Sequence, residues 1–259
     1  DLGISHEADH SALALVLRNP DVDVLCSPHS YRRRKPGEDG MFRGFPASVR
    51  SQGKLWLDEQ DDRTCFAVRS AEWQKQYTHV KTVPESIEIL WRGFAQALTH
   101  NAGLWMMDQG ALWQKIPEGH FYRDSAIAAA LEQMRAVAER SMARDRHRRT
   151  ELAVVCDYRS RYYMIDPASE DHPTVRLYAQ ALGELCKCGA PFDMYQLPEV
   201  FEPGTPEYKA YVFLDTFFTT DAELAAVQAL KARGKTLLFY FAPALLSEAG
   251  ISVDRVKTL

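Results

Sequence analysis

The sequence predicts a mixed α/β protein built on parallel strands. Short apolar runs alternate with helical patterns along the chain, and this strand–loop–helix order is typical of parallel strands joined by crossover helices. Acidic residues gather where the predicted strands end, at residues 58–62 and 108, on the face where parallel α/β proteins build their sites. The composition agrees with a folded protein, because 46% of the 259 residues are hydrophobic and 25% are charged.

The first half of the chain repeats the strand–loop–helix unit. Apolar spacing of three and four residues indicates helices, and short apolar runs indicate strands. Helices are expected at residues 11–19, 47–52, 83–98 and 125–144, and strands at 22–28, 54–60 and 104–108. The first strand is expected to be buried. The loop after it, residues 29–47, is rich in Gly, Pro and Arg, which favours a functional loop over a tight connection.

The second half begins the pattern again as a doubly wound α/β domain. Its first strand lacks the G-x-G-x-x-G that a dinucleotide site needs and is followed by Asp157, Tyr158, Arg159 and Ser160. A basic stretch at residues 144–149 indicates a solvated helix end and linker. The expected domains are therefore 1–146 and 147–259. Strands are expected at residues 152–157, 192–195, 211–214 and 236–241, and helices at 175–185 and 221–232.

Charge and cysteine usage exclude several classes of partner. A net charge of −4 and a pI of about 6.1 disfavour a nucleic-acid-binding protein. No apolar run reaches the roughly 18–20 residues of a membrane span. The five cysteines are odd in number and form no C-x-x-C, which favours reduced thiols in a cytosol-like compartment and no metal site. Because the chain starts at Asp1 within a helical pattern, we expect a fragment or a processed product.

Glu59 is the first candidate for chemistry. It closes the second predicted strand beside Asp58, and Arg63 is a plausible cationic partner. A nucleophilic carboxylate must be rigidly held and ionised, which a strand end and a nearby cation provide. Strand alternation sends Asp58 and Glu59 to opposite faces, so only one of them can face a barrel interior. The alternative is a solvated acidic loop.

Two further groups of residues are candidates for sugar binding. Trp105 and Asp108 close the third strand, where an aromatic ring can pack on the C–H face of a sugar and a carboxylate can accept hydroxyl hydrogen bonds. A core tryptophan and a capping aspartate explain them equally well. Tyr31 and Arg34, with Arg32, lie in the long first loop and could bind hydroxyls or order the acidic cluster; a solvated basic run is the alternative. His29 in that loop is a general acid–base candidate that can equally have no such role.

These segments together resemble a known family. Residues 27–37 (Ser-Pro-His-Ser-Tyr, then Arg34, Pro36 and Gly37), 53–64 (Gly-Lys-Leu-Trp-Leu-Asp-Glu-Gln-Asp-Asp-Arg-Thr) and 103–108 (Gly-Leu-Trp-Met-Met-Asp) are similar to clan A glycoside hydrolases, and more closely to β-galactosidase-like proteins of glycoside hydrolase family 42. The second half resembles the β-galactosidase trimerisation domain, a flavodoxin-like or amidotransferase-like module. The most specific piece is the Gly-Lys…Asp-Glu-x-Asp-x-Arg-Thr segment.

The resemblance implies a fold and a mechanism. The fold would be the last three strands of a (β/α)8 TIM barrel followed by the flavodoxin-like domain. Glu59 would be the nucleophile of a retaining β-galactosidase-like glycosidase, with Arg63 as its support and Tyr31, Arg34, Trp105 and Asp108 as substrate contacts. A second carboxylate, outside this chain, would act as acid/base about 5 Å away. The chain alone would then be inactive, need no cofactor or metal, take an oligosaccharide or β-galactoside, and belong to a homotrimer.

A second class of function stays open. A degenerate barrel that keeps sugar contacts without turnover would be a carbohydrate-binding or scaffolding protein. Presence or absence of the acid/base carboxylate separates the two hypotheses. The sequence does not fix which sugar is recognised. If Glu59 is not the nucleophile, Asp58 is the next candidate.

Overall fold

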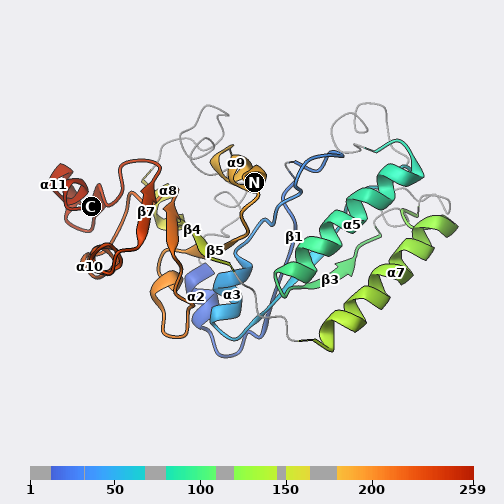
Figure 1. Cartoon of the computed structure of the whole chain (residues 1–259), viewed down its shortest axis with the longest axis horizontal. Coiled ribbons are helices and arrows are strands. Elements are labelled where there is room, and N and C mark those ends of the chain that lie inside the picture. Colours follow the sequence, from blue (N-terminus) through green and yellow to red (C-terminus); the bar gives the residue numbers. More distant parts are fainter. Residues whose placement is uncertain (1–12, 32, 68–79, 109–119, 145–149, 164–179) are drawn as a thin grey trace. The chain divides into compact units, whose positions relative to one another are not determined.

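The computed structural model describes residues 13–31, 33–67, 80–108, 120–144, 150–163 and 180–259. These residues form two compact units (Figure 1). The N-terminal unit comprises residues 24–44 and 55–148, and the C-terminal unit comprises the described parts of 1–23, 45–54 and 149–259. Each unit is described by itself.

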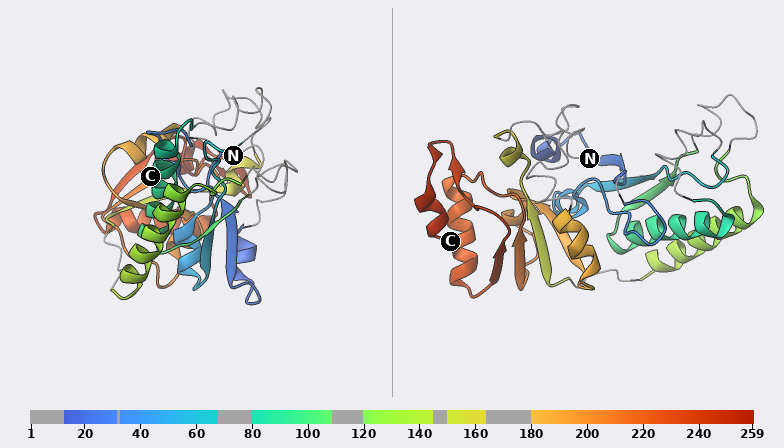
Figure 2. Two further views of the ribbon diagram at one scale, coloured as in Figure 1. Left: turned by 90° about the vertical axis from the view of Figure 1, so that its right-hand side faces the viewer. Right: turned by 90° about the horizontal axis from the view of Figure 1, so that it is seen from above.

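The N-terminal unit contains a three-stranded parallel sheet. Its strands are β1 (Val24–Pro28), β2 (Leu55–Gln60) and β3 (Gly103–Met106), in the spatial order β1-β2-β3. Helices α5 (Val83–Thr99) and α7 (Ser125–Met142) lie together along one face of this sheet (Figure 2). Parallel strands joined by helices are what the repeated strand–helix pattern predicts, and this prediction is confirmed.

Helix α5 begins where the sequence predicts, and its capping explains why. Thr82 accepts a hydrogen bond from the backbone N–H of Glu85, whose carboxylate accepts one from the N–H of Thr82. This reciprocal capping box satisfies two otherwise unpaired donors. Pro84 occupies the first turn, where the missing N–H has no cost. The core between the helices and β3 contains Leu90, Phe94, Ile127, Ala130 and Met134, with Leu104 and Met106 packed against them.

The opposite face of this sheet is open in the described part of the structure. Val24 on β1 is 47% exposed and Leu55 on β2 is 43% exposed. The prediction that the first strand is buried is therefore wrong, because the helices cover only the other face. Trp56 lies on the covered face and is buried, as a core residue should be.

The C-terminal unit contains a four-stranded parallel sheet. Its order is β5-β4-β6-β7, so the strand order reverses between β4 and β6, as in doubly wound folds. The strands are β4 (Leu152–Cys156), β5 (Phe192–Gln196), β6 (Ala210–Phe213) and β7 (Thr236–Phe239), and a small antiparallel pair, β8 (Leu246–Ser247) and β9 (Gly250–Ile251), follows. The helices are α2 (Leu13–Arg18), α3 (Pro46–Ser51), α8 (Tyr158–Arg161), α9 (Ala181–Lys187), η2 (Glu199–Phe201), α10 (Asp221–Ala232) and α11 (Val253–Lys257).

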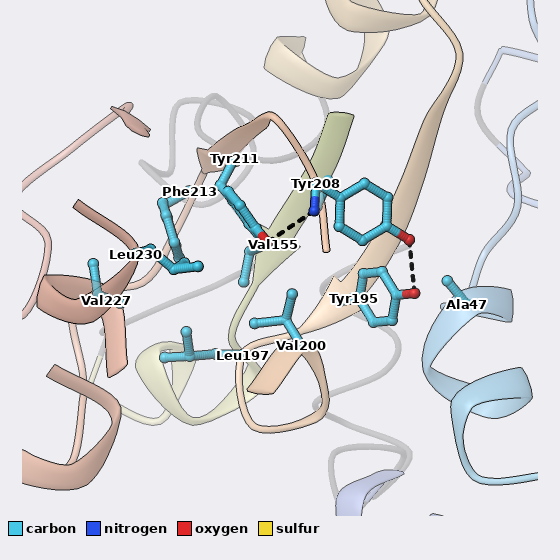
Figure 3. Packing of buried hydrophobic residues seen from close by; sticks show 11 residues of the cluster. Ala47, Val155, Tyr195, Leu197, Val200, Tyr208, Tyr211, Phe213, Val227 and Leu230 are labelled. Carbon is cyan, nitrogen blue, oxygen red and sulfur yellow. Dashed lines mark hydrogen bonds between the residues drawn. The ribbon is translucent and has the colours of Figure 1, made fainter. Parts of the chain in front are cut away.

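The core of this unit joins apolar packing to a chain of tyrosine hydroxyls (Figure 3). Tyr195 and Tyr208 share a 2.9 Å hydrogen bond between their hydroxyls, and Tyr208 donates at 2.9 Å to Asp193. The hydroxyl of Tyr211 accepts from the backbone N–H of Tyr208 at 3.0 Å. Each ring can be fully buried because its polar end has a partner.

Helix α3 is far from this sheet in sequence but packs on it. Ala47 belongs to the same core cluster, and the Ser48 hydroxyl accepts a hydrogen bond from the backbone N–H of Gln196 at 2.9 Å. Residues 45–54 group with residues 149–259 in one compact unit, which sequence patterns do not reveal.

Most element bounds agree with the sequence. Helix α10 has the expected bounds, and α9 extends to Lys187, while residues 175–179 of the expected helix lie outside the described residues. The short elements α8, η2, β8, β9 and α11 are not predicted by periodicity because they are too short to show any. No described helix has the length and apolarity that crossing a bilayer requires.

Candidate functional site

The carboxyl ends of β1, β2 and β3 meet at one edge of the N-terminal sheet. The loop after β1 begins with His29, and β2 closes with Asp58, Glu59 and Gln60 and runs on into Asp61 and Asp62. Parallel register places these strand ends side by side, with Pro28 opposite Glu59 and Glu59 opposite Trp105. The sheet therefore gathers the polar residues that the sequence singles out.

Strand alternation separates Asp58 from Glu59. Asp58 and Gln60 are buried on the face that α5 covers. The fit there is tight, since a Cβ added to Gly93 of α5 would lie 1.9 Å from Gln60 Oε1. Glu59 consequently points to the open face, together with its strand neighbours Leu55 and Leu57. Of the two carboxylates that the sequence left open, Glu59 is the one on the uncovered face.

The carboxylate of Glu59 is half-buried, and no hydrogen bond or ion pair to it exists among the residues that the structure describes. Burial and the negative charge of Asp61 raise the pKa of Glu59, while the guanidinium of Arg34 acts to lower it. A carboxylate that is fixed on a strand and has no hydrogen-bond or ion-pair partner among the described residues is available to a ligand.

Trp105 stands beside Glu59 on the same face. The two residues are direct partners in the parallel register of β2 and β3. The indole is 38% exposed, and its Nε1 donates to Cys26 Sγ on β1 at 3.2 Å, so the ring reaches across β2. An indole fixed by such a contact offers a flat apolar surface next to an acceptor. The sequence left open a buried core role for Trp105, and its exposure argues against that alternative.

A buried ion network lies under the other side of the same strand end. His29 is 1% exposed, with Nε2 3.0 Å from Asp62 Oδ2 and Nδ1 3.3 Å from Asp58 Oδ2. Burial lowers the pKa of His29, but the charge of Asp62 and the side-chain hydrogen bonds of Asp58 and Asp62 outweigh it and raise the value to about 9. Reciprocally, His29 and Arg34 lower the pKa of Asp62 despite its burial. At neutral pH this site thus holds an imidazolium against the ionised Asp62, while burial raises the pKa of Asp58 despite its contact with His29.

Arg34 ties the loop after β1 to the end of β2. Its Nε and Nη2 donate to the backbone carbonyls of Ser30 and His29 at 2.8 and 2.7 Å, and its Nη1 lies 2.7 Å from Asp61 Oδ1. Tyr31 donates to the other oxygen of Asp61 at 3.1 Å, and the guanidinium of Arg34 lies 4.3 Å from the Tyr31 ring centroid. Arg34 is buried and already committed to these contacts. Its geometry is that of a group ordering the acidic segment, while the ring of Tyr31 stays partly exposed.

Asp108 follows β3 and contacts two residues that precede α7. Its Oδ1 accepts from the backbone N–H of Phe121 at 3.0 Å, and its Oδ2 lies 3.2 Å from Nδ1 of His120. These contacts fit the capping role that the sequence left open beside sugar binding. A substrate contact of Asp108 remains a prediction.

The structure gives little information on the two remaining candidates, Arg63 and Arg32. Arg63 is half-buried, and no ion pair between Arg63 and Glu59 is found in the described part of the structure, so its support of the nucleophile also remains a prediction. Arg32 lies outside the described residues.

Sequence reasoning missed the double pairing of His29 and the central place of Asp62. Asp62 also accepts from Gln60 Nε2 at 2.5 Å, and Arg92 of α5 lies 3.9 Å from it. The available signal was the sheer number of acidic residues in 58–62 without an equal number of local cations. Such a run at a buried strand end requires cations from other segments. No group of three or more His, Cys, Asp or Glu side chains suited to a metal ion occurs in the described ranges.

Comparison with known proteins shows the fold and little more. No protein-family model matches the chain, and no curated protein matches it in sequence. Among solved structures, a GH42 β-galactosidase from G. stearothermophilus, solved as a catalytic mutant, is similar with a TM-score of 0.55 and 14% identity over 93% of this chain. The β-galactosidase from Rahnella sp. R3 is similar with a TM-score of 0.59 and 12% identity over 89% of this chain.

The chain spans about a third of each of these two structures, 35% and 34% of their lengths. At such identities the likeness concerns the fold, not the chemistry. The comparisons therefore support a β-galactosidase-like α/β fold for this chain, and the arrangement of Glu59 and Trp105 has to be judged on its own geometry.

Proposed function

We propose that the N-terminal unit carries part of a retaining β-glycosidase site, of β-galactosidase type, in which Glu59 is the nucleophile. The observation that carries the proposal is the pairing on one open face of an unengaged carboxylate, Glu59, with an exposed indole, Trp105, at adjacent register positions. The β-galactosidase-like fold supports the same substrate class.

The chemistry assigned to each residue follows from its surroundings. The ring of Trp105 packs on the apolar C–H face of the sugar, which orients the anomeric carbon toward Glu59. Glu59 attacks that carbon, the glycosidic bond to the leaving oxygen breaks, and a glycosyl ester forms. Water then hydrolyses the ester and restores the carboxylate. Because its pKa is raised, the reactive ionised form of Glu59 increases as the pH rises.

The acid/base carboxylate of such a pair is expected roughly 5 Å from the nucleophile. The nearby described carboxylates do not suit this role, because Asp58 and Asp62 face His29, and Asp61 is held by Arg34 and Tyr31. This observation favours one alternative, a carbohydrate-binding protein without turnover. On the proposal, the acid comes from a segment other than these, and the chain alone does not turn over a substrate with a poor leaving group.

The first step can be tested without the acid. The test uses a 2-deoxy-2-fluoro-β-galactoside with a dinitrophenyl leaving group. This leaving group departs without being protonated, and the ester that the fluorosugar forms with the nucleophile hydrolyses slowly. We expect the chain to gain one fluorosugar, located on Glu59 by peptide mass spectrometry. Glu59→Gln should abolish the label, and Glu88→Gln, at an exposed carboxylate of α5, should keep it.

Each other outcome has a definite meaning. A label on Asp58 would make that residue the nucleophile and contradict the assignment. Galactoside binding that quenches Trp105 fluorescence, without any label, would favour the carbohydrate-binding alternative. If the chain is neither labelled by the fluorosugar nor binds a galactoside, both proposed functions are contradicted for this chain.

A further inference from the structure

The buried imidazole of His29 joins the two ends of the segment that carries Glu59. Asp58 directly precedes Glu59 on β2, and Asp62 follows it by three residues. Each of these aspartates places an Oδ2 against a different nitrogen of the same ring, at 3.3 and 3.0 Å. The ring comes from another segment, the end of β1, and is almost completely buried.

The other cations of the network do not replace His29. Arg34 lies 2.7 Å from Asp61 and 3.7 Å from Asp62, and Arg92 of α5 lies 3.9 Å from Asp62. Among the described residues, His29 is the only ion-pair partner of Asp58. The carboxylate of Asp58 also accepts a long hydrogen bond, 3.5 Å, from the indole of Trp56. A buried carboxylate that loses its one cation must take up a proton or move. Either response would disturb the residue next to Glu59.

We propose that His29 is a positioning residue for the nucleophile: as an imidazolium it ties Asp58 to Asp62, fixes the strand end, and keeps the Glu59 carboxylate on the open face. This inference rests on the proposed role of Glu59. It adds a residue that does not touch the sugar and acts through the strand that carries the nucleophile.

The electrostatics support the same assignment. The charge of His29 is one of the influences that lower the pKa of Glu59, with Arg34, against burial and the charges of Asp61 and Asp58. With Asp58 and Asp62 still ionised, removing the imidazolium should therefore raise the pKa of Glu59 and lower its ionised fraction at a given pH, whereas a proton taken up by Asp58 would act in the opposite direction. A residue that only filled space would leave that pKa unchanged.

The test follows the carboxyl of Glu59 directly by NMR in the full chain. The chain is labelled with ¹³C at glutamate carboxyls, and the signal that Glu59→Gln removes is assigned to Glu59. We expect His29→Gln to move the titration midpoint of Glu59 upward, because one influence that lowers the pKa is removed. The matched control is His120→Gln, which removes a partly exposed histidine paired with Asp108 and should leave the midpoint in place. An unchanged midpoint in a folded His29→Gln variant would overturn the proposal.

A measurement on the unchanged chain decides the matter if His29→Gln fails to fold. The imidazole of His29 should titrate near pH 9 rather than near its ordinary value, and the Glu59 signal should show a second inflection at the same pH. A His29 midpoint near 6.5, or a Glu59 signal that is flat across the His29 transition, would overturn the proposal. Because neither titration needs turnover, these results are separate from the fluorosugar experiment that tests Glu59 as nucleophile.

Discussion

Asp58 and Glu59 are chain neighbours in opposite surroundings. Asp58 faces the imidazole of His29 on the covered side of β2, and Glu59 faces the open side beside Trp105. Sequence alternation predicts that the two differ, but it does not say which one is covered. That choice depends on which face α5 occupies, and α5 meets β2 at Gly93, where a side chain would collide with Gln60.

A second buried carboxylate, in the C-terminal unit, gives a prediction at this scale. Glu199 is fully buried, neither carboxylate oxygen has a hydrogen-bond partner among the described residues, and Arg18 lies 3.9 Å from one of them. Burial raises the pKa of Glu199 to about 7. The folded state therefore binds a proton that the unfolded state releases near pH 4.5, so its stabilising effect is full at acid pH and is lost as the pH rises toward 7.

We expect Glu199→Gln to raise the free energy of unfolding at pH 8 by up to about 3 kcal/mol, since each pKa unit corresponds to roughly 1.4 kcal/mol. Near pH 4.5 the same change should have little effect. Urea denaturation at the two pH values measures both. Glu202→Gln, which removes a partly exposed partner of Arg18, serves as control and should change stability by less than about 1 kcal/mol at either pH. Equal effects of Glu199→Gln at both pH values would contradict the assigned pKa.

At the scale of elements, the contact between α5 and β2 opposes helix propensity to packing. Alanine is the better helix former by about 1 kcal/mol, so propensity alone predicts that Gly93→Ala stabilises α5. A Cβ at this position would lie 1.9 Å from Gln60 Oε1, whose amide nitrogen in turn donates to Asp62. We expect packing to win and Gly93→Ala to lower the free energy of unfolding by about 1–3 kcal/mol.

The control for that experiment lies two residues away on the same helix. Ala95 is exposed, so Ala95→Gly measures propensity alone and should cost about 1 kcal/mol. Thermal or urea unfolding gives both values. A Gly93→Ala protein that is more stable than the parent would mean that α5 and β2 separate without cost.

The elements also show what sequence patterns can and cannot predict. Helices α5, α7 and α10 were predictable because each combines long apolar periodicity with an N-terminal cap: Thr82, Asp124 and Thr220. The buried first strand was a wrong prediction because apolar residues alone do not reveal whether a sheet is covered on both faces. Within the candidate site, Glu59 and Trp105 were predictable as strand-end residues. The pairing of His29 with Asp58 and Asp62 was not, because it joins segments about thirty residues apart.

At the scale of the whole molecule, the two units do not follow one cut in the sequence. The domain pattern alone would separate residues 1–146 from 147–259. The C-terminal sheet, however, is covered in part by α3, through Ala47 and Ser48. Arg50 of the same helix lies 3.3 Å from the buried Asp193 on β5. Propensity gives α3 a helical shape but cannot name its partner strand.

This arrangement predicts that residues 149–259 do not form a well-packed unit on their own. Without α3 they would expose apolar surface of the core and leave Asp193 without its arginine. We expect this piece to bind the dye ANS and to unfold with a broad, weakly cooperative urea transition. The matched control joins residues 45–54 to the same piece through a flexible Gly/Ser linker and should restore a sharp transition. A sharp transition without residues 45–54 would show that α3 is dispensable.

The position of α3 has a further consequence for how the chain is made. Ser48 leaves the ribosome long before Gln196, its partner 148 residues further along. The last residue that groups with the N-terminal unit is residue 148, whereas α3 must wait for β5 to be synthesised. Pairings so distant in sequence are slow to form, because a long loop must be closed first. Between the synthesis of Ser48 and that of Gln196, the apolar side of α3 has no partner strand to pack on. A chaperone that binds apolar segments would act on the chain in this interval.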